Sequence, residues 1–150
     1  MDTGPHAPIT AVLWRATQRI ARTFDQVLAE HGGSRPVFFI LMALHDGPYA
    51  TQRELAAMIG LGEATLTHHL TAMEDRELVT RHREAANRRV QQIRLTPAGA
   101  ALLDTLRTEA AVLEGEVRAA IGSPGQVAEL AETLRRMADA VDEGCPPPLV

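Results

Sequence analysis

The sequence predicts a mainly α-helical fold with a small β-wing, in which a winged helix-turn-helix is flanked by N- and C-terminal helices. Apolar residues recur at intervals of three and four along most of the chain, which is the period of an amphipathic helix. Between residues 79 and 95 the pattern changes to alternation, which is typical of strands. A chain of 150 residues can bury a core as one domain, so we expect a single domain over residues 1–150.

The first helix is expected over residues 9–31, where an apolar stripe lies opposite three arginines. Gly32 and Gly33 would end this helix, because glycine adopts the backbone conformations that a helix end requires. Ser34 can then cap a second helix, and Pro36 suits the first turn of that helix.

Residues 37–44 (VFFILMAL) are apolar on every side, which predicts a helix that is buried all round. In a chain of this length, such burial requires an unusually thick core or a second subunit. Phe39 and Met42 leave two interpretations open. Their side chains either pack in the core, or they line an apolar cavity or an additional interface.

A helix, a tight turn and a second helix are expected between residues 51 and 78. Thr51 and Glu54 have the spacing of a capping box, in which each side chain satisfies a backbone N–H at the helix start. Gly60 and Gly62 suit the turn. The second helix has an apolar stripe of Leu66, Leu70 and Met73, and its other face carries Thr65, Thr67, His68 and Thr71. Short or hydrogen-bonding side chains of this kind are expected on a helix that enters a DNA major groove.

Two strands follow, at residues 79–83 and 91–95, and residues 84–90 form a plausible hairpin tip. Residues 76–94 hold six arginines against two glutamates, a local charge of +4, although the whole chain has a formal charge of −4. A basic wing on an acidic body indicates a phosphate-bearing partner. A solvated, salt-bridged surface loop is the alternative interpretation.

Two long helices, at residues 97–121 and 124–142, complete the predicted fold. Each opens with proline after a serine or threonine that can cap it. No other apolar surface in this half of the chain could cover them, so we expect these helices to pack against a second copy of the chain. The second helix has apolar residues at the spacing of a coiled-coil seam: Val127, Leu130, Leu134, Met137 and Val141.

Three segments resemble the MarR family of bacterial transcription regulators: TQRELA from Thr51, LGEATLTHHLTAMEDRELV from Leu61, and NRRVQQIRLTPAG from Asn87. In the family the last block reads Asp-Arg-Arg, three residues, an apolar residue, any residue and Leu-Thr-x-x-Gly. Its fixed spacing across both strands of the wing makes the pattern specific. The resemblance covers about residues 9–142.

The resemblance implies a DNA-binding lobe at residues 34–96, with dimerisation helices at residues 9–31 and 97–142. A homodimer would present two recognition helices to successive major grooves of double-stranded DNA, so its operator should be near-palindromic. Repression is the commoner outcome in the family. Our DNA-contact candidates are Thr65, Thr67 and His68 on the recognition helix, Thr51 and Gln52 at phosphates, and Arg88 and Arg89 in the wing.

Relatives commonly bind small anionic or phenolic compounds between the dimerisation helices and the DNA-binding lobe, which changes the spacing of the two recognition helices. For this chain we expect a small apolar or phenolic effector. The candidate residues form a mostly apolar lining with one polar handle: Trp14, Phe38, Phe39, Met42 and His45.

A metal- or redox-responsive sensor on the same fold is one alternative, and a winged helix used only for protein contact is another. Six histidines and Cys145 are available, but none has a metal-ligand spacing, so we assign no metal and no cofactor. His69 is interpreted as a half-buried structural residue. No Gly-rich phosphate loop or Gly-x-Ser-x-Gly motif is present, so no enzyme and no catalytic residue is expected. One cysteine, no long apolar run and no signal segment predict a cytoplasmic protein without membrane contact.

Overall fold

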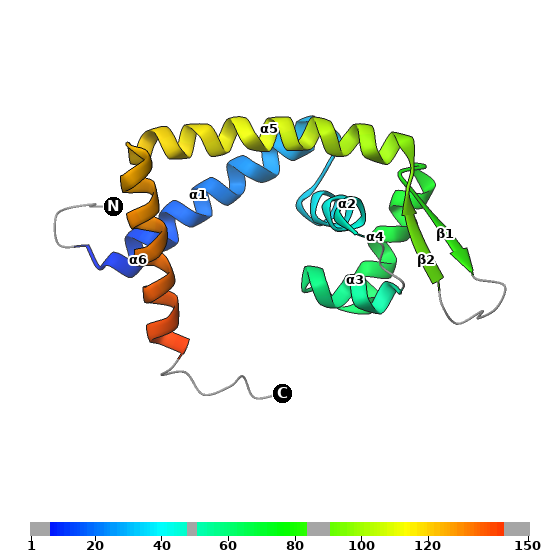
Figure 1. The fold of residues 1–150 in the computed structure, drawn as a ribbon, viewed down its shortest axis with the longest axis horizontal. Coiled ribbons are helices and arrows are strands. Elements are labelled where there is room, and N and C mark those ends of the chain that lie inside the picture. The colour runs from blue at the N-terminus through cyan, green and yellow to red at the C-terminus, as the bar shows by residue number, and fades with distance from the viewer. Residues whose placement is uncertain (1–6, 48–50, 84–90, 143–150) are drawn as a thin grey trace. The chain divides into compact units, whose positions relative to one another are not determined.

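The computed structural model describes residues 7–47, 51–83 and 91–142, and these residues form six helices and one two-stranded sheet (Figure 1). The predicted mainly α-helical fold with a small β-wing is confirmed. By their internal contacts the residues divide into two compact units, Met1–Ala110 and Ala111–Val150, and the single domain stays a prediction. In chain order the elements are α1 (Ile9–Glu30), α2 (Arg35–Asp46), α3 (Gln52–Ile59), α4 (Glu63–Asp75), β1 (Val79–Arg83), β2 (Gln91–Leu95), α5 (Pro97–Ile121) and α6 (Pro124–Asp142).

Hydrogen bonds between residues close in sequence fix the connection between α1 and α2. Gly32 takes the left-handed conformation, with φ of 78°, and the Gly33 amide donates to the Leu28 carbonyl oxygen at 2.8 Å. The Ser34 hydroxyl oxygen then accepts from the Val37 amide at 3.4 Å and caps α2, as predicted. The end of one helix and the start of the next are therefore set within six residues.

Helix α2 lies at the centre of the first unit and packs against α1, α3, α4 and β2. The prediction that residues 37–44 are buried on every side is wrong for Phe39, which is 46% exposed. The neighbouring elements cover the other sides of α2, but Phe39 and Met42 border a surface hollow. The buried residues of α2 are Val37, Phe38, Ile40, Leu41 and Ala43.

Strands β1 and β2 pair antiparallel at the predicted bounds, with Val79 opposite Leu95. Beyond them, Thr96 ties the start of α5 to the residues before β1. Its hydroxyl accepts from the Gly99 amide at 3.0 Å and donates to the Glu77 carbonyl at 2.6 Å. Gly99 has no space for a side chain, because a Cβ atom there would lie 2.1 Å from the Leu78 carbonyl oxygen. This close approach explains the glycine of the Leu-Thr-x-x-Gly pattern.

The second unit contains the C-terminal part of α5 and all of α6. The predicted start of α6 is confirmed, because Ser123 and Gln126 form reciprocal hydrogen bonds between side chain and backbone. Several apolar residues of this unit are at least one-third exposed: Val112, Leu130, Leu134 and Val141. Among the described helices, none is both long enough and apolar enough to cross a membrane.

Candidate nucleic-acid interface

The helix-turn-helix is built from α3, a glycine-flanked turn and α4. Gly60 ends α3 in the left-handed conformation, with φ of 69°, and Gly62 precedes α4. The N-cap residue of α4 is Gly62, so the first backbone N–H groups of this helix have no side-chain cap. Helix α4 is anchored in the core by the predicted stripe: Leu66, Leu70 and Met73 are at most 1% exposed.

Helix α3 begins with the predicted capping box. The Thr51 hydroxyl oxygen accepts from the Glu54 amide at 3.1 Å, and the Glu54 carboxylate accepts from the Thr51 amide at 3.1 Å. Gln52 is the first residue of the helix, and its side chain crosses to α4. Its amide nitrogen donates to the Thr67 hydroxyl oxygen, and lies 3.5 Å from the Glu63 carbonyl oxygen. Gln52 therefore connects the two helices.

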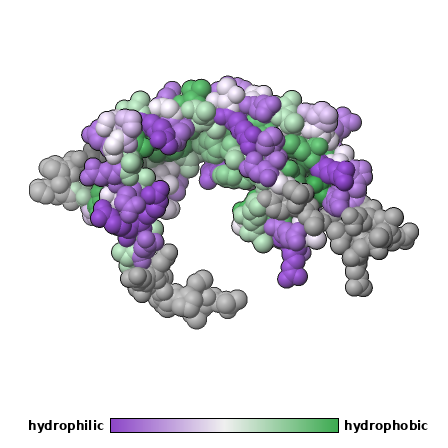
Figure 2. All heavy atoms as spheres, in the orientation of Figure 1, coloured by the Kyte–Doolittle hydropathy of each residue, from purple (hydrophilic) through white to green (hydrophobic). Residues whose placement is uncertain are grey.

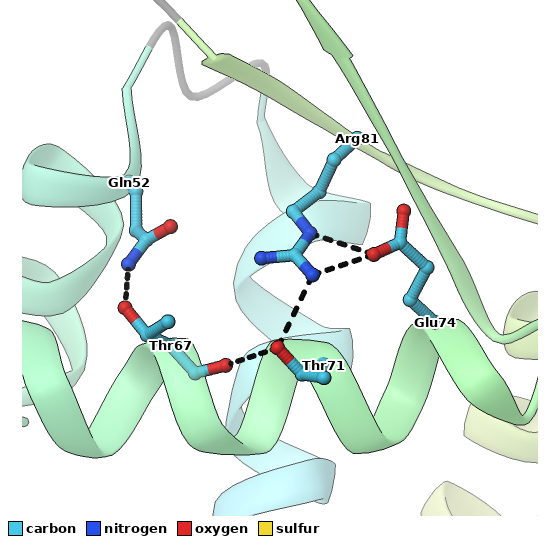
Figure 3. A network of polar contacts seen from close by, with 5 residues as sticks. All are labelled: Gln52, Thr67, Thr71, Glu74 and Arg81. Carbon is cyan, nitrogen blue, oxygen red and sulfur yellow. Dashed lines mark hydrogen bonds and ion pairs between the residues drawn. The ribbon is translucent and has the colours of Figure 1, made fainter.

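A second set of contacts connects α4 with β1. Arg81 Nε and Nη2 lie 2.8 Å and 2.6 Å from one carboxylate oxygen of Glu74, and Nη2 also donates to the Thr71 hydroxyl at 3.2 Å. The Arg81 side chain is only 16% exposed. Figure 3 shows these contacts on the same side of α4 as the one from α3, in a network of Gln52, Thr67, Thr71, Glu74 and Arg81.

The sequence interpretation missed Arg81 as a functional residue. A signal was present, because residues 79 and 81 share one face of a strand, and Val79 is a core residue. An arginine on the core-facing side of a strand needs a partner that accepts its hydrogen bonds. Glu74, seven positions earlier on α4, is that partner.

The predicted DNA-contact residues occupy different environments. Thr65 and His68 are exposed on α4, and the His68 ring lies 5.9 Å from the ring of His69. Thr67 is also exposed, but its hydroxyl takes part in the network above. His69 is half-buried, as expected. Arg88 and Arg89 lie outside the described residues, so their predicted contacts stay predictions.

The predicted effector residues do not all border one hollow within the described residues. Phe39 and Met42 border a hollow of about 390 Å³ between α2 and α3. Phe38 is buried, with its ring centroid 5.7 Å from that of Phe24, and His45 is exposed and does not border the hollow. The remaining lining residues of this hollow are Ala43, Asp46, Met58 and Ile59.

Trp14 borders a different hollow, of about 580 Å³, on α1. This helix carries three arginines on the same side, Arg15, Arg19 and Arg22. Among the described residues, no group of three or more His, Cys, Asp or Glu side chains could hold a metal ion. Cys145 lies outside those residues.

Comparison with known proteins agrees with this geometry. The model of the MarR family matches residues 34–90. The transcriptional repressor CouR, solved bound to a 23-mer DNA duplex, is 26% identical with a TM-score of 0.78, over 92% of this chain and 98% of that one. The M. tuberculosis transcriptional regulator MOSR, solved in complex with DNA, is 27% identical with a TM-score of 0.65, over 90% and 98%.

Bordetella bronchiseptica BpsR, whose DNA binding is regulated by 6-hydroxynicotinic acid, is 23% identical with a TM-score of 0.71, over 93% of this chain and 99% of that one. At that identity the likeness shows the fold alone. The family match includes α2, α3, α4 and β1, which carry the geometry described above. The two DNA-bound regulators extend the likeness to nine-tenths of the chain or more. Residues 34–90 match the MarR family of winged helix-turn-helix transcriptional regulators, which confirms the predicted resemblance over the helix-turn-helix and the first strand of the wing.

Proposed function

We propose that the protein is a homodimeric repressor that binds a near-palindromic operator and is released from it by a small effector. The observation that carries the DNA-binding part is the structure of α4. Its apolar side is anchored in the core by Leu66 and Leu70, while Thr65 and His68 face outward. A helix held in this way beside a β-hairpin can place polar side chains against base edges.

The charge distribution supports the same proposal. The whole chain is acidic, but residues 76–94 carry a local charge of +4. Arg94, on β2, is exposed, and its guanidinium lies 3.2 Å from the Gln92 side-chain oxygen. Positive charge near the wing would attract the phosphate backbone, while the acidic remainder would disfavour other contacts with DNA.

Fluorescence anisotropy would test DNA binding, with labelled DNA from upstream of the protein's own gene and a scrambled duplex of equal length. We expect tighter binding to the upstream DNA, and an affinity that falls steeply as salt rises. The double variant Arg88→Ala/Arg89→Ala should bind more weakly and with a shallower salt dependence. No binding to either duplex at low salt would refute the proposal in favour of a protein-contact module.

Exposed apolar surface supports the homodimer. Apolar side chains reach the surface beside hydrophilic ones (Figure 2). On α6 they follow the spacing of a coiled-coil seam, and on α1 they include Ile9, Val12 and Ile20. Contiguous exposed apolar residues on long helices are expected to be covered by a partner.

Charge complementarity indicates how the two copies would meet. Arg15, Arg19 and Arg22 of α1 are exposed, and none of them is in an ion pair with another described residue. Residues 111–142 hold six acidic side chains and three arginines, a net charge of −3. We therefore propose that α1 of one copy packs near the acidic C-terminal helices of the other.

The hollow beside Phe39 and Met42 is our proposed effector site. Its volume of about 390 Å³ lies within the range of small-molecule sites, and its lining is apolar apart from Asp46. The Asp46 carboxylate lies 3.2 Å from Arg107 Nη2 of α5, so a polar ligand group could displace either partner. An effector would release DNA only if it bound the non-binding conformation more tightly.

This site predicts the behaviour of two variants. Phe39→Ala and Met42→Ala should lower the sensitivity of the DNA complex to phenolic compounds, without changing DNA affinity in their absence. The measurement is anisotropy of the DNA complex during titration with a panel of phenolic and aromatic carboxylic acids. An unchanged dose response in both variants would remove this hollow as the effector site.

A further inference from the structure

We propose that α4 carries two separate stripes of side chains outside the core, of which one braces the helix and the other reads DNA. The bracing stripe is Thr67, Thr71 and Glu74, and the reading stripe is Thr65, His68 and Ala72. The inference rests on the proposed DNA-binding function and assigns roles within it. It makes Ala72 a specificity-determining residue and Arg81 a positioning residue.

The two stripes follow from helical periodicity. Thr67, Thr71 and Glu74 are spaced by four and three residues, so they share one side of α4. Figure 3 shows all three on the side that faces Gln52 and Arg81. Thr65, His68 and Ala72 have spacings of three and four, which place them together on another side of the helix. All three members of this reading stripe are exposed.

The hydroxyl of Thr67 has no proton left for DNA. Its single proton is donated to the Glu63 carbonyl oxygen at 2.8 Å, and its oxygen accepts from the Gln52 amide nitrogen. Phosphate oxygens and the N7 and O6 atoms of guanine accept hydrogen bonds only. Thr67 therefore cannot donate to them unless it gives up a bond that holds α4.

The side-chain amide of Gln52 is likewise occupied by hydrogen bonds within the protein. Its amide nitrogen lies near two oxygens, those of Thr67 and of the Glu63 carbonyl. A carbonyl oxygen only accepts, so the nitrogen of the amide must face it. The remaining side-chain oxygen cannot donate to phosphate. Any phosphate contact of Gln52 would then come from its backbone N–H at the start of α3.

Arg81, on β1, completes the brace on the same side of α4. Its guanidinium binds the Glu74 carboxylate and the Thr71 hydroxyl, and Thr71 donates its own proton to the Thr67 carbonyl oxygen at 3.0 Å. Because its side chain is only 16% exposed and its charge is paired, Arg81 is poorly placed to bind phosphate. Its role is to fix α4 relative to the wing.

The reading stripe differs from the bracing stripe, because its polar groups make no hydrogen bonds within the described residues. No hydrogen bond of the Thr65 hydroxyl or of the His68 ring nitrogens is found within the described residues. A threonine hydroxyl can contact any base, and a histidine N–H can donate to a purine N7 or O6. The methyl group of Ala72 suits contact with the methyl group of thymine.

The experiment is selection of preferred sequences from randomised duplexes, followed by affinity measurement across a salt series. Arg81→Met should lower affinity for the selected duplex by about tenfold, keep the same preferred sequence and leave the salt slope unchanged. Thr71→Val should act in the same direction, and Thr71→Ser should restore binding, because serine keeps the hydroxyl. His68→Ala and Ala72→Gln should instead change the preferred base at one position of each half-site.

The control is Arg35→Met. Arg35 forms a comparable two-point ion pair with Asp25, at 2.9 Å and 2.5 Å, between α1 and α2. Its loss should leave the preferred sequence and the affinity unchanged. If loss of the Arg81 pair only weakened folding, Arg81→Met would lower thermal stability and reduce binding to selected and scrambled duplexes equally.

The outcomes separate the two levels of the proposal. A wild-type protein that enriches no sequence would refute both the DNA-binding function and this inference. Sequence enrichment by the wild type, with a salt slope that falls by about one in Arg81→Met, would refute the inference alone and make Arg81 a phosphate contact. A changed base preference in Thr71→Val would refute the separation of the stripes.

Discussion

Gly99→Ala is the substitution whose effect the structure defines best. Gly99 is buried at the start of α5, where an added Cβ atom would lie 2.1 Å from the Leu78 carbonyl oxygen and 2.8 Å from a methyl carbon of Leu95. Ordinary contact begins at 3.4 Å, so the backbones must separate by about 1.3 Å. That carbonyl also accepts from the Thr96 amide at 3.1 Å, so the movement would strain this hydrogen bond.

The magnitude follows from two opposing effects. Forcing extra atoms into a packed site typically costs about 1–3 kcal/mol, and alanine recovers about 1 kcal/mol through its higher helix propensity. The obstacle here is backbone, which cannot rotate aside, so the upper part of that range applies and the net loss is about 2 kcal/mol. For a chain of this size, such a loss lowers Tm by about 4–8 °C.

Gly115→Ala is the matched control on the same helix. A Cβ atom at Gly115 would meet nothing within 4 Å, and the residue lies on the opposite side of α5 from Leu113 and Val117. Alanine should therefore stabilise the protein by up to about 1 kcal/mol. Both variants should be compared with wild type by thermal and urea unfolding at one protein concentration. A Gly99→Ala variant as stable as wild type would refute the steric reasoning.

Three further predictions concern other parts of the fold. Thr96→Ala should cost about 1–2 kcal/mol of unfolding free energy in urea, because two hydrogen bonds are lost, whereas Thr96→Ser should retain most of the stability. The hydrogen bond and charge of Arg35 hold the pKa of the Asp25 carboxyl below its ordinary value of 3.8. Because the folded-state pKa is lowered, the ion pair stabilises the protein above pH 3.8, and this stabilisation is lost as the carboxyl is protonated at lower pH. The difference in unfolding free energy between wild type and Asp25→Asn should therefore shrink in acid titrations below pH 3.8. Leu134→Glu should shift the protein toward the monomer in light scattering, whereas Ala128→Glu, on the opposite side of α6, should not; equal effects would argue against the seam.

Helix boundaries could be predicted from the sequence because the chemistry that sets them is local. Ser34, Thr51 and Ser123 each bind a backbone amide three residues away, so the pattern is visible without tertiary structure. The strand bounds followed from the change of period, since alternation is also a property of neighbouring residues. Contacts between residues only a few positions apart can therefore be predicted from the sequence alone.

Tertiary relations could not be predicted in the same way. Arg81 finds Glu74 and Thr71 only because β1 folds back along α4. The sequence left both a core position and a cavity or interface position open for Phe39, because its exposure depends on which elements cover α2. Trp14 was grouped with Phe39 from a family resemblance, yet the two residues border different hollows. Packing decides which side chains border the same hollow, and the pattern of neighbouring residues in the sequence does not show that packing.

The bracing of α4 by Gln52 and Arg81 has a consequence for how such a regulator could change its target. The side chains that hold the helix in place are distinct from Thr65, His68 and Ala72, which we propose contact the bases. Substitutions at those three exposed positions could therefore alter the preferred operator without weakening the support of the helix. A gene copy could in this way acquire new target promoters through one or two mutations, while each intermediate sequence still encodes a folded regulator.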